Sequence, residues 1–316
     1  MAAYQFVLFD CALSTADANA LSIRGEGIVN DSLVTIRELI GWDLDEYSYR
    51  DFDFDPQKDR LREAISQARL ALKMRKGYTP SNALMMQETN HIKSLLDFPL
   101  GRTDLQTEYE GLDWSLGVVD LSCLLAFQRR LVFDPELRQS QTPLQHDWAS
   151  LLSFALGPAK TTSYTLISHA TTGQYQEFTL HSPNPDLRLQ SIDEGQPDSR
   201  FPFTLHGGSP FLEVAELRGR WFLRDGYHRA YRLLKKGVSH IPAVVIRARS
   251  IEEVGAVEPW FFNEQQLFSA HPPRVTDFLE DDLVLCYERP RLIKMLNIQI
   301  KEMLVPNERK RQGDNV

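Results

Sequence analysis

The amino-acid sequence predicts an α+β fold, and three patterns in it carry this prediction. Apolar residues recur at helical spacing over 61–72, and runs rich in Thr, Tyr and Phe cover 161–181. The segment 211–246 has the pattern of a strand, a turn, a helix and a second strand. Helices and strands are thus both expected, with the helices concentrated at the two ends of the chain.

The first 108 residues are predicted to form a mainly helical N-terminal region. A short helix is expected over 32–40, ending at Gly41. Asp55-Pro56 then combines a cap with a favoured first-turn proline, and an amphipathic helix follows until Gly77. The segment 78–107 contains Pro80, Pro99 and Gly101 and is predicted to be an irregular connector or lid, so we place the domain boundary there.

The second region, 109–316, is predicted to start with a strand over 117–121. A helix is expected from Thr142-Pro143 to Leu156, and a hairpin from 161–169 and 174–181. Ser250 and Glu253 have the spacing of a capping box, so a helical C-terminal extension is predicted from about 250 onward.

Composition limits the class of protein. The 316 residues carry a net charge of −8, with 42% hydrophobic and 25% charged residues, which is the ordinary range of a soluble protein. An acidic chain makes direct nucleic-acid binding a less favoured function. Three widely spaced cysteines predict no disulfide framework, and no signal peptide or membrane span is expected, so we predict a cytoplasmic protein.

The turn Asp225-Gly226 is the most informative position for function. A helix that begins after it presents unpaired main-chain N–H groups, which favour an anion, and Gly226 lets the chain turn or approach a ligand closely. His228 and Arg229 lie in the first helical turn, where a cation is unfavourable unless an anion accompanies it. The pattern therefore predicts a phosphate site, to which Arg232 adds a further cation.

Each of these residues also has a structural interpretation. Asp225 could serve only as the helix N-cap, and Arg229 could be a solvated surface residue. Tyr227 and Tyr231 are four residues apart, which suits core packing as well as base stacking. The basic run Arg229, Arg232, Lys235 and Lys236 could be a solvated helix face.

The order strand, Asp-Gly-x-His-Arg, helix, Gly237, Ile241-Pro242 and strand resembles the ParB/sulfiredoxin superfamily over about forty residues. The turn is most similar to that of the free serine kinases, with Tyr227 in place of their first histidine. The resemblance implies a ParB/sulfiredoxin-like core, a small mixed sheet with helices, into which the helix ending at Leu156 and the following hairpin are inserted. It also implies a nucleotide over the turn, bound by Gly226, Tyr227, His228, Arg229 and Arg232, with Asp225 and His228 in catalytic roles.

The sequence also departs from these families. Sulfiredoxins need a cysteine where Tyr227 stands, so sulfur-reducing chemistry is not expected. Free serine kinases carry a catalytic glutamate in the region of Gln128, and a glutamine cannot act as a general base.

We therefore expect a protein that binds a nucleotide or another phosphorylated small molecule. If it is an enzyme, a phosphotransferase or nucleotide hydrolase is expected, using Mg²⁺ with ATP, ADP or CTP. One alternative is a non-enzymatic ligand-gated switch or DNA-associated interaction protein, and a second is a scaffold that has lost ligand binding. The sequence leaves open whether the protein forms a homo-oligomer. No dedicated metal site is predicted, since the histidines and cysteines lack ligand spacing, and a solvated face is the favoured interpretation of Glu280, Asp281 and Asp282.

Overall fold

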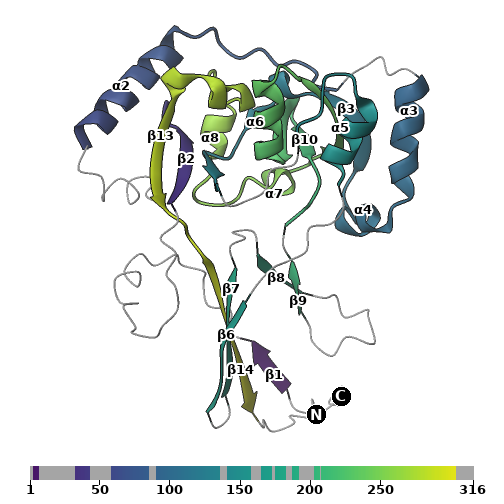
Figure 1. The fold of residues 1–316 in the computed structure, drawn as a ribbon, viewed down its shortest axis with the longest axis vertical. Coiled ribbons are helices and arrows are strands. Elements are labelled where there is room, and N and C mark those ends of the chain that lie inside the picture. The colour runs from purple at the N-terminus through teal and green to yellow at the C-terminus, as the bar shows by residue number, and fades with distance from the viewer. Residues whose placement is uncertain are drawn as a thin grey trace, which may run out of the picture. The chain divides into compact units, whose positions relative to one another are not determined.

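The computed structural model describes residues 3–6, 33–42, 58–84, 90–135, 141–157, 165–172, 175–182, 187–191, 203–206 and 208–303. It contains both helices and several β-sheets, which confirms the α+β class (Figure 1). The chain divides into two compact units. The main unit comprises Asp31–Lys160 and Ser209–Arg291, and the small unit comprises Met1–Asn30, Thr161–Gly208 and Leu292–Val316.

A five-stranded mixed sheet forms the centre of the main unit. Its strands lie in the order β3 (Trp114–Asp120), β12 (His240–Arg247), β10 (Glu213–Leu217), β11 (Arg220–Asp225) and β4 (Leu125–Ala126). β12 runs antiparallel to β3 and parallel to β10, β10 and β11 form an antiparallel hairpin, and β4 runs parallel to β11. Six consecutive residues of β12 are buried, as expected for a central strand that is covered on both faces.

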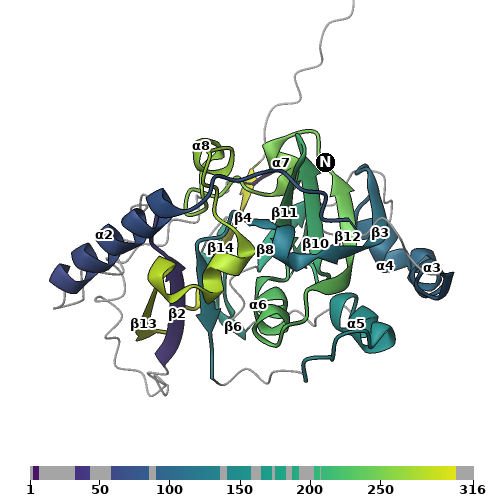
Figure 2. The same cartoon turned by 90° about the horizontal axis from the view of Figure 1, so that it is seen from above.

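Helices surround this sheet, as Figures 1 and 2 show. α5 (Trp148–Ala155) contacts β12, and α7 (Ile251–Val254) contacts β10. α6 (Tyr227–Lys235) follows β11 after one residue, and α8 (Glu264–Leu267) lies further along the chain. α3 (Asn90–Asp97) and α4 (Thr103–Glu108) precede β3, and α3 contacts α5. Four short 3₁₀ helices complete this part of the structure: Phe98–Gly101, Leu121–Cys123, Val275–Leu279 and Asp281–Leu283.

A second, antiparallel sheet of the main unit has the order β13 (Val284–Pro290), β2 (Leu33–Leu39) and β5 (Arg130–Phe133). The long helix α2 (Lys58–Met74) contacts β13. This helix agrees with the one predicted before Gly77, because Leu61, Ala68 and Leu72 are buried on one face. Asp55 and Pro56, its expected start, lie outside the described residues.

The small unit is built around a four-stranded antiparallel sheet. Its order is β1 (Ala3–Phe6), β14 (Lys294–Met303), β7 (Tyr175–Ser182) and β6 (Thr165–Thr172). β6 and β7 confirm the predicted hairpin, and Leu180, Leu187 and Leu296 form a small apolar cluster. A separate two-stranded pair consists of β8 (Arg188–Ser191) and β9 (Phe203–His206).

Two predicted helical regions are wrong. Residues 32–40 were expected to be a helix, but 33–39 form strand β2. Val34 and Ile36 alternate with exposed residues, and β2 pairs with β13 on one side and β5 on the other. The C-terminal extension from about 250 is not mainly helical, because β13 and β14 occupy most of 284–303.

Two further boundaries differ from the predictions. The connector 78–107 contains α3 and α4. The helix expected from Thr142 begins instead at Trp148, where the side chain of Asp147 accepts a hydrogen bond from the main-chain N–H of Ser150. The capped start at Ser250 is confirmed by α7, since the Ser250 side chain accepts a bond from the N–H of Glu253.

The division into units also differs from the predicted regions 1–108 and 109–316. Leu105 and Tyr109 lie on either side of that boundary, yet both belong to the apolar core that contains Val119. The boundary at 108 therefore falls inside the main unit. No described helix combines the length and apolar character needed to cross a membrane.

Candidate functional site

The predicted order of strand, turn, helix and strand around Asp225 is confirmed by β11, α6 and β12. Gly226 has a φ of 94° and is the residue that precedes the first turn of α6. The carboxylate of Asp225 accepts a hydrogen bond from the N–H of Gly226, and Oδ1 lies 3.9 Å from Nη2 of Arg229. The N-cap of α6 is thus Gly226 and not Asp225, and no side-chain cap bond forms there.

The guanidinium of Arg229 points toward main-chain carbonyls. Nη1 donates to the carbonyl of Pro210 at 2.7 Å and to that of Ala155 at 3.1 Å, and Nη2 donates to that of Phe211 at 2.6 Å. Ala155 is the last residue of α5, where carbonyls without helical partners carry partial negative charge. Burial lowers the pKa of Arg229. The cation at the positive end of α6 therefore has its negative counterpart in the C-terminal end of another helix.

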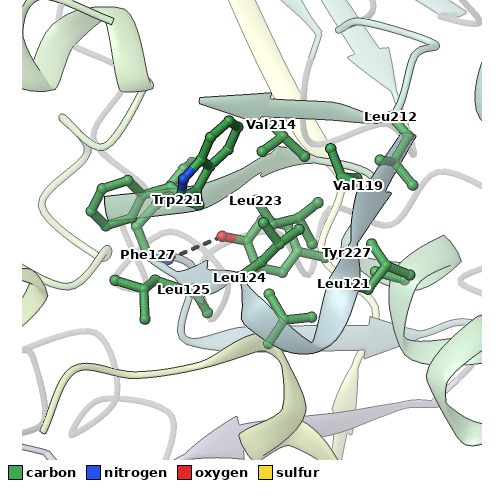
Figure 3. Close-up of a cluster of buried hydrophobic side chains, with 14 of the residues drawn as sticks. Val119, Leu121, Leu124, Leu125, Phe127, Leu212, Val214, Trp221, Leu223 and Tyr227 are labelled. Carbon is green, nitrogen blue, oxygen red and sulfur yellow. Dashed lines mark hydrogen bonds between the residues drawn. The ribbon is translucent and has the colours of Figure 1, made fainter. Parts of the chain in front are cut away.

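Tyr227 belongs to the core. Its side chain is 5% exposed and lies among apolar residues that include Leu121, Leu124 and Leu223 (Figure 3). Its hydroxyl oxygen accepts hydrogen bonds from the N–H groups of Phe127, at 3.0 Å, and Gln128, at 3.3 Å. Burial raises the pKa of Tyr227. This side chain fixes the loop after β4 against the first turn of α6, so core packing describes it better than contact with a ligand.

His228, in the first turn of α6, is exposed and contacts β5. Its Nε2 is 2.8 Å from the carbonyl oxygen of Val132, and since a carbonyl only accepts, the ring nitrogen is the donor. The ring meets Phe133 edge-on, with 5.5 Å between ring centroids and an interplanar angle of 83°. His228 thus supports Phe133, while Asp225 lies beside Gly226 and Arg229.

An open concavity of about 640 Å³ lies further along α6, and Arg232 is the one predicted site residue that lines it. The lining combines the second half of α6 with the end of β5 and the segment before α5. The lining residues are Phe133, Gln141, Thr142, Tyr231, Arg232, Lys235 and Lys236.

Arg232 is held in place at the edge of the concavity. Its Nη2 donates to Oγ1 of Thr142 at 3.1 Å, and its guanidinium carbon lies 5.5 Å from the ring centroid of Phe154. Thr142 is buried, and burial lowers the pKa of Arg232. A fixed guanidinium loses less side-chain entropy when it binds an anion than a solvated one does.

Lys235 and Lys236 add two exposed cations at the end of α6. Neither forms an ion pair with any residue that the structure describes. The negative end of the helix dipole accounts for part of their stability, as it does for basic residues in many last turns. Lys235 also lies over the ring of Tyr231, with 5.9 Å between Nζ and the ring centroid.

None of the lining residues that the structure describes carries a carboxylate. The described parts of the chain also contain no group of three or more His, Cys, Asp or Glu side chains that could hold a metal ion. Asp281, one of the acidic residues considered for Mg²⁺, pairs with Arg37 at 2.7 Å. The described side chains of the lining can therefore neutralise an anion, but they include no carboxylate that could coordinate a cation.

Sequence reasoning found Arg232 and the basic run, but it missed Phe133, Gln141 and Thr142 as neighbours of that run. These residues are about 90 to 100 positions away in the sequence, and no local pattern links them to α6. Comparison with family models, with curated proteins and with solved structures finds no match for this chain.

Proposed function

We propose that this protein binds a phosphorylated ligand, a nucleotide or another small phosphate compound, in the concavity beside α6. The observation that carries the proposal is a cluster of three cations, Arg232, Lys235 and Lys236, around one hollow whose described lining residues include no carboxylate. Phosphate is the common biological anion that accepts several hydrogen bonds and carries more than one charge.

The spacing of these cations supports the proposal. Residues three and four positions apart on a helix are neighbours, and like charges at this spacing destabilise the helix by about 0.2 to 0.5 kcal/mol per pair. Arg232 has both Lys235 and Lys236 at such positions. A multivalent anion in the concavity relieves this repulsion, in a chain whose net charge of −8 would otherwise keep anions away.

The chemistry of the site supports a protein that binds its ligand without converting it. A phosphotransferase or hydrolase needs a group that activates the nucleophile, and metal ions commonly assist it. His228 already donates to a carbonyl oxygen, and the amide of Gln128 donates to the carbonyl of Arg130 at 2.7 Å. A ligand-responsive binding protein is therefore a better description of this site than an enzyme.

Isothermal titration calorimetry with inorganic tripolyphosphate tests the proposal. We expect saturable binding by the wild type and about tenfold weaker binding by the double variant Lys235→Gln/Lys236→Gln, since each lost contact is worth about 0.5 to 1 kcal/mol. Lys93→Gln, which removes an exposed cation from α3, is the matched control and keeps the wild-type affinity. Equal affinities for the wild type and the double variant would place the site elsewhere.

A further inference from the structure

We infer that the concavity recognises a chain of phosphate groups and does not discriminate between the organic groups attached to it. This inference rests on the proposed function and narrows it: inorganic tripolyphosphate and different nucleoside triphosphates are equivalent ligands. Three features of the lining carry it, namely the donor character of its polar groups, the packing of its rings and the position of its cations.

The polar groups of the lining mostly donate hydrogen bonds. Lys235, Lys236 and Arg232 have only donors, and Thr142 already accepts a bond from Arg232. A phosphate group has only strong acceptors on its exposed oxygens, so this set matches it. The edge of a nucleobase presents donors as well as acceptors, and in the described lining the amide of Gln141 and the hydroxyl of Tyr231 offer both. One exposed amide and one hydroxyl are a weak basis for choosing between bases.

The aromatic rings of the lining are already engaged with each other and with cations. Phe133 and Tyr231 pack at 5.2 Å with an interplanar angle of 56°, and His228 meets Phe133 edge-on. Tyr231 also has Lys235 and the guanidinium of Arg37 over its ring, each 5.9 Å from the centroid. A base that stacks on a protein needs an accessible ring face. These rings act as a support for the cations more than as a platform for a base.

The cations extend along α6 from a side chain held by its neighbours to two exposed ones. Arg232 is held by Thr142 and Phe154, and Lys235 and Lys236 follow at the exposed end of α6. Such a row suits several linked phosphates better than a single one, because each added phosphate meets another positive charge. The affinity should therefore rise with the number of phosphate groups and fall with ionic strength.

The test compares ligands that share phosphates and differ in the organic group. Calorimetric titrations at one ionic strength use orthophosphate, pyrophosphate, tripolyphosphate, ATP, CTP and adenosine, without added metal. We expect tripolyphosphate, ATP and CTP to agree within about twofold, affinity to fall from tripolyphosphate to orthophosphate, and adenosine to give no binding heat. A difference of about tenfold or more between ATP and CTP, or nucleotide binding without tripolyphosphate binding, would overturn the inference.

Two variants separate this inference from the proposed function. Phe133→Leu changes the ring surface but no charge, and we expect the ratio of ATP to tripolyphosphate affinity to stay constant. A selective loss of ATP binding in Phe133→Leu would show base stacking and contradict the inference alone. Lys235→Gln/Lys236→Gln weakens all phosphate ligands together. If no phosphate compound binds the wild type, the proposed function fails and the inference fails with it.

Discussion

At the scale of single residues, a guanidinium that donates to several main-chain carbonyls connects segments distant in the sequence. Arg229 of α6 joins the end of α5, through Ala155, to Pro210 and Phe211 before β10. The carbonyl of Ala155 also accepts a hydrogen bond from the N–H of Leu212, at 2.8 Å, whereas Arg229 supplies a donor to the buried carbonyls of Pro210 and Phe211. Arg229 is therefore expected to contribute mainly to stability.

Replacing Arg229 should destabilise the fold. We expect Arg229→Ala to lower the free energy of unfolding by about 2 to 4 kcal/mol, because it removes charged hydrogen bonds and takes this donor away from the buried carbonyls of Pro210 and Phe211. Urea unfolding followed by circular dichroism measures this. The control is Arg249→Ala, whose side chain is 71% exposed and pairs with Glu253, and whose effect should stay within about 0.5 kcal/mol. Equal effects at both positions would contradict the role given to Arg229.

Two tyrosines give a matched pair of predictions. The hydroxyl of Tyr78 is buried and has no hydrogen-bond partner in the described residues, whereas that of Tyr227 accepts from two N–H groups. Tyr227→Phe should cost about 1 to 3 kcal/mol, because it leaves those buried donors unpaired. Tyr78→Phe should be neutral or stabilising, because the ring and its contact with Arg220, at 4.9 Å, remain. Thermal unfolding of the two variants measures these changes in stability. A loss of stability in Tyr78→Phe comparable to that in Tyr227→Phe would mean that the Tyr78 hydroxyl has a partner.

The sequence located the turn at Asp225, but it did not identify the hydrogen-bond partners of the side chains around this turn. The sequence analysis expected a bound anion beside the cation at the start of α6. In the structure this cation lies 3.9 Å from the carboxylate of Asp225 and donates to main-chain carbonyls, which any residue type supplies and which therefore leave no trace in the sequence. Thr142 could not be recognised from the sequence as the partner of Arg232 for a different reason, since its side-chain hydroxyl comes from a segment 90 residues earlier in the chain.

At the scale of elements, strands were predicted well where their pattern was local and poorly where distant partners decide. The hairpin of β6 and β7 and the order around β11 and α6 followed from turn residues and alternation. β2 was predicted as part of a short helix over 32–40 that ends at Gly41. Its run of Val34, Thr35 and Ile36 favours a strand, and pairing with β13, some 250 residues later, settles the conformation.

The junction between β11 and α6 gives a prediction at this scale. Gly226, with φ of 94°, would place an added Cβ 3.0 Å from Cγ of Leu212 and 3.3 Å from Nε of Arg229. Gly237, after α6, has a φ of 75° but no atom within 4 Å of such a Cβ. Gly237→Ala should thus cost about 1 kcal/mol for its left-handed backbone, and Gly226→Ala about 1 to 3 kcal/mol more for the clash.

Denaturant unfolding of the two glycine variants measures this difference directly. Each variant serves as the control for the other, because both glycines flank α6 and both have a positive φ. Equal losses of stability in the two variants would mean that the chain relaxes around the new methyl group at Gly226 without cost.

At the scale of the whole molecule, the chain leaves the main unit after α5 and returns before β10. The small unit combines the intervening segment with both ends of the chain. A unit made from three separate segments has no single boundary in the sequence, so a division at one position such as 108 could not describe it. Each of the seven described residues that line the concavity beside α6 belongs to the main unit.

The main unit should fold without the small unit. The N–H of Leu212 donates to the carbonyl of Ala155 at 2.8 Å, so the points of exit and return are adjacent, and a few glycine and serine residues can replace 158–208. A chain of residues 31–291 shortened in this way is expected to unfold cooperatively and to bind tripolyphosphate with the wild-type affinity. Near-ultraviolet circular dichroism and calorimetry test both outcomes. Loss of fixed aromatic signals in the shortened chain would show that the main unit depends on the small one, because its core would then lack unique packing.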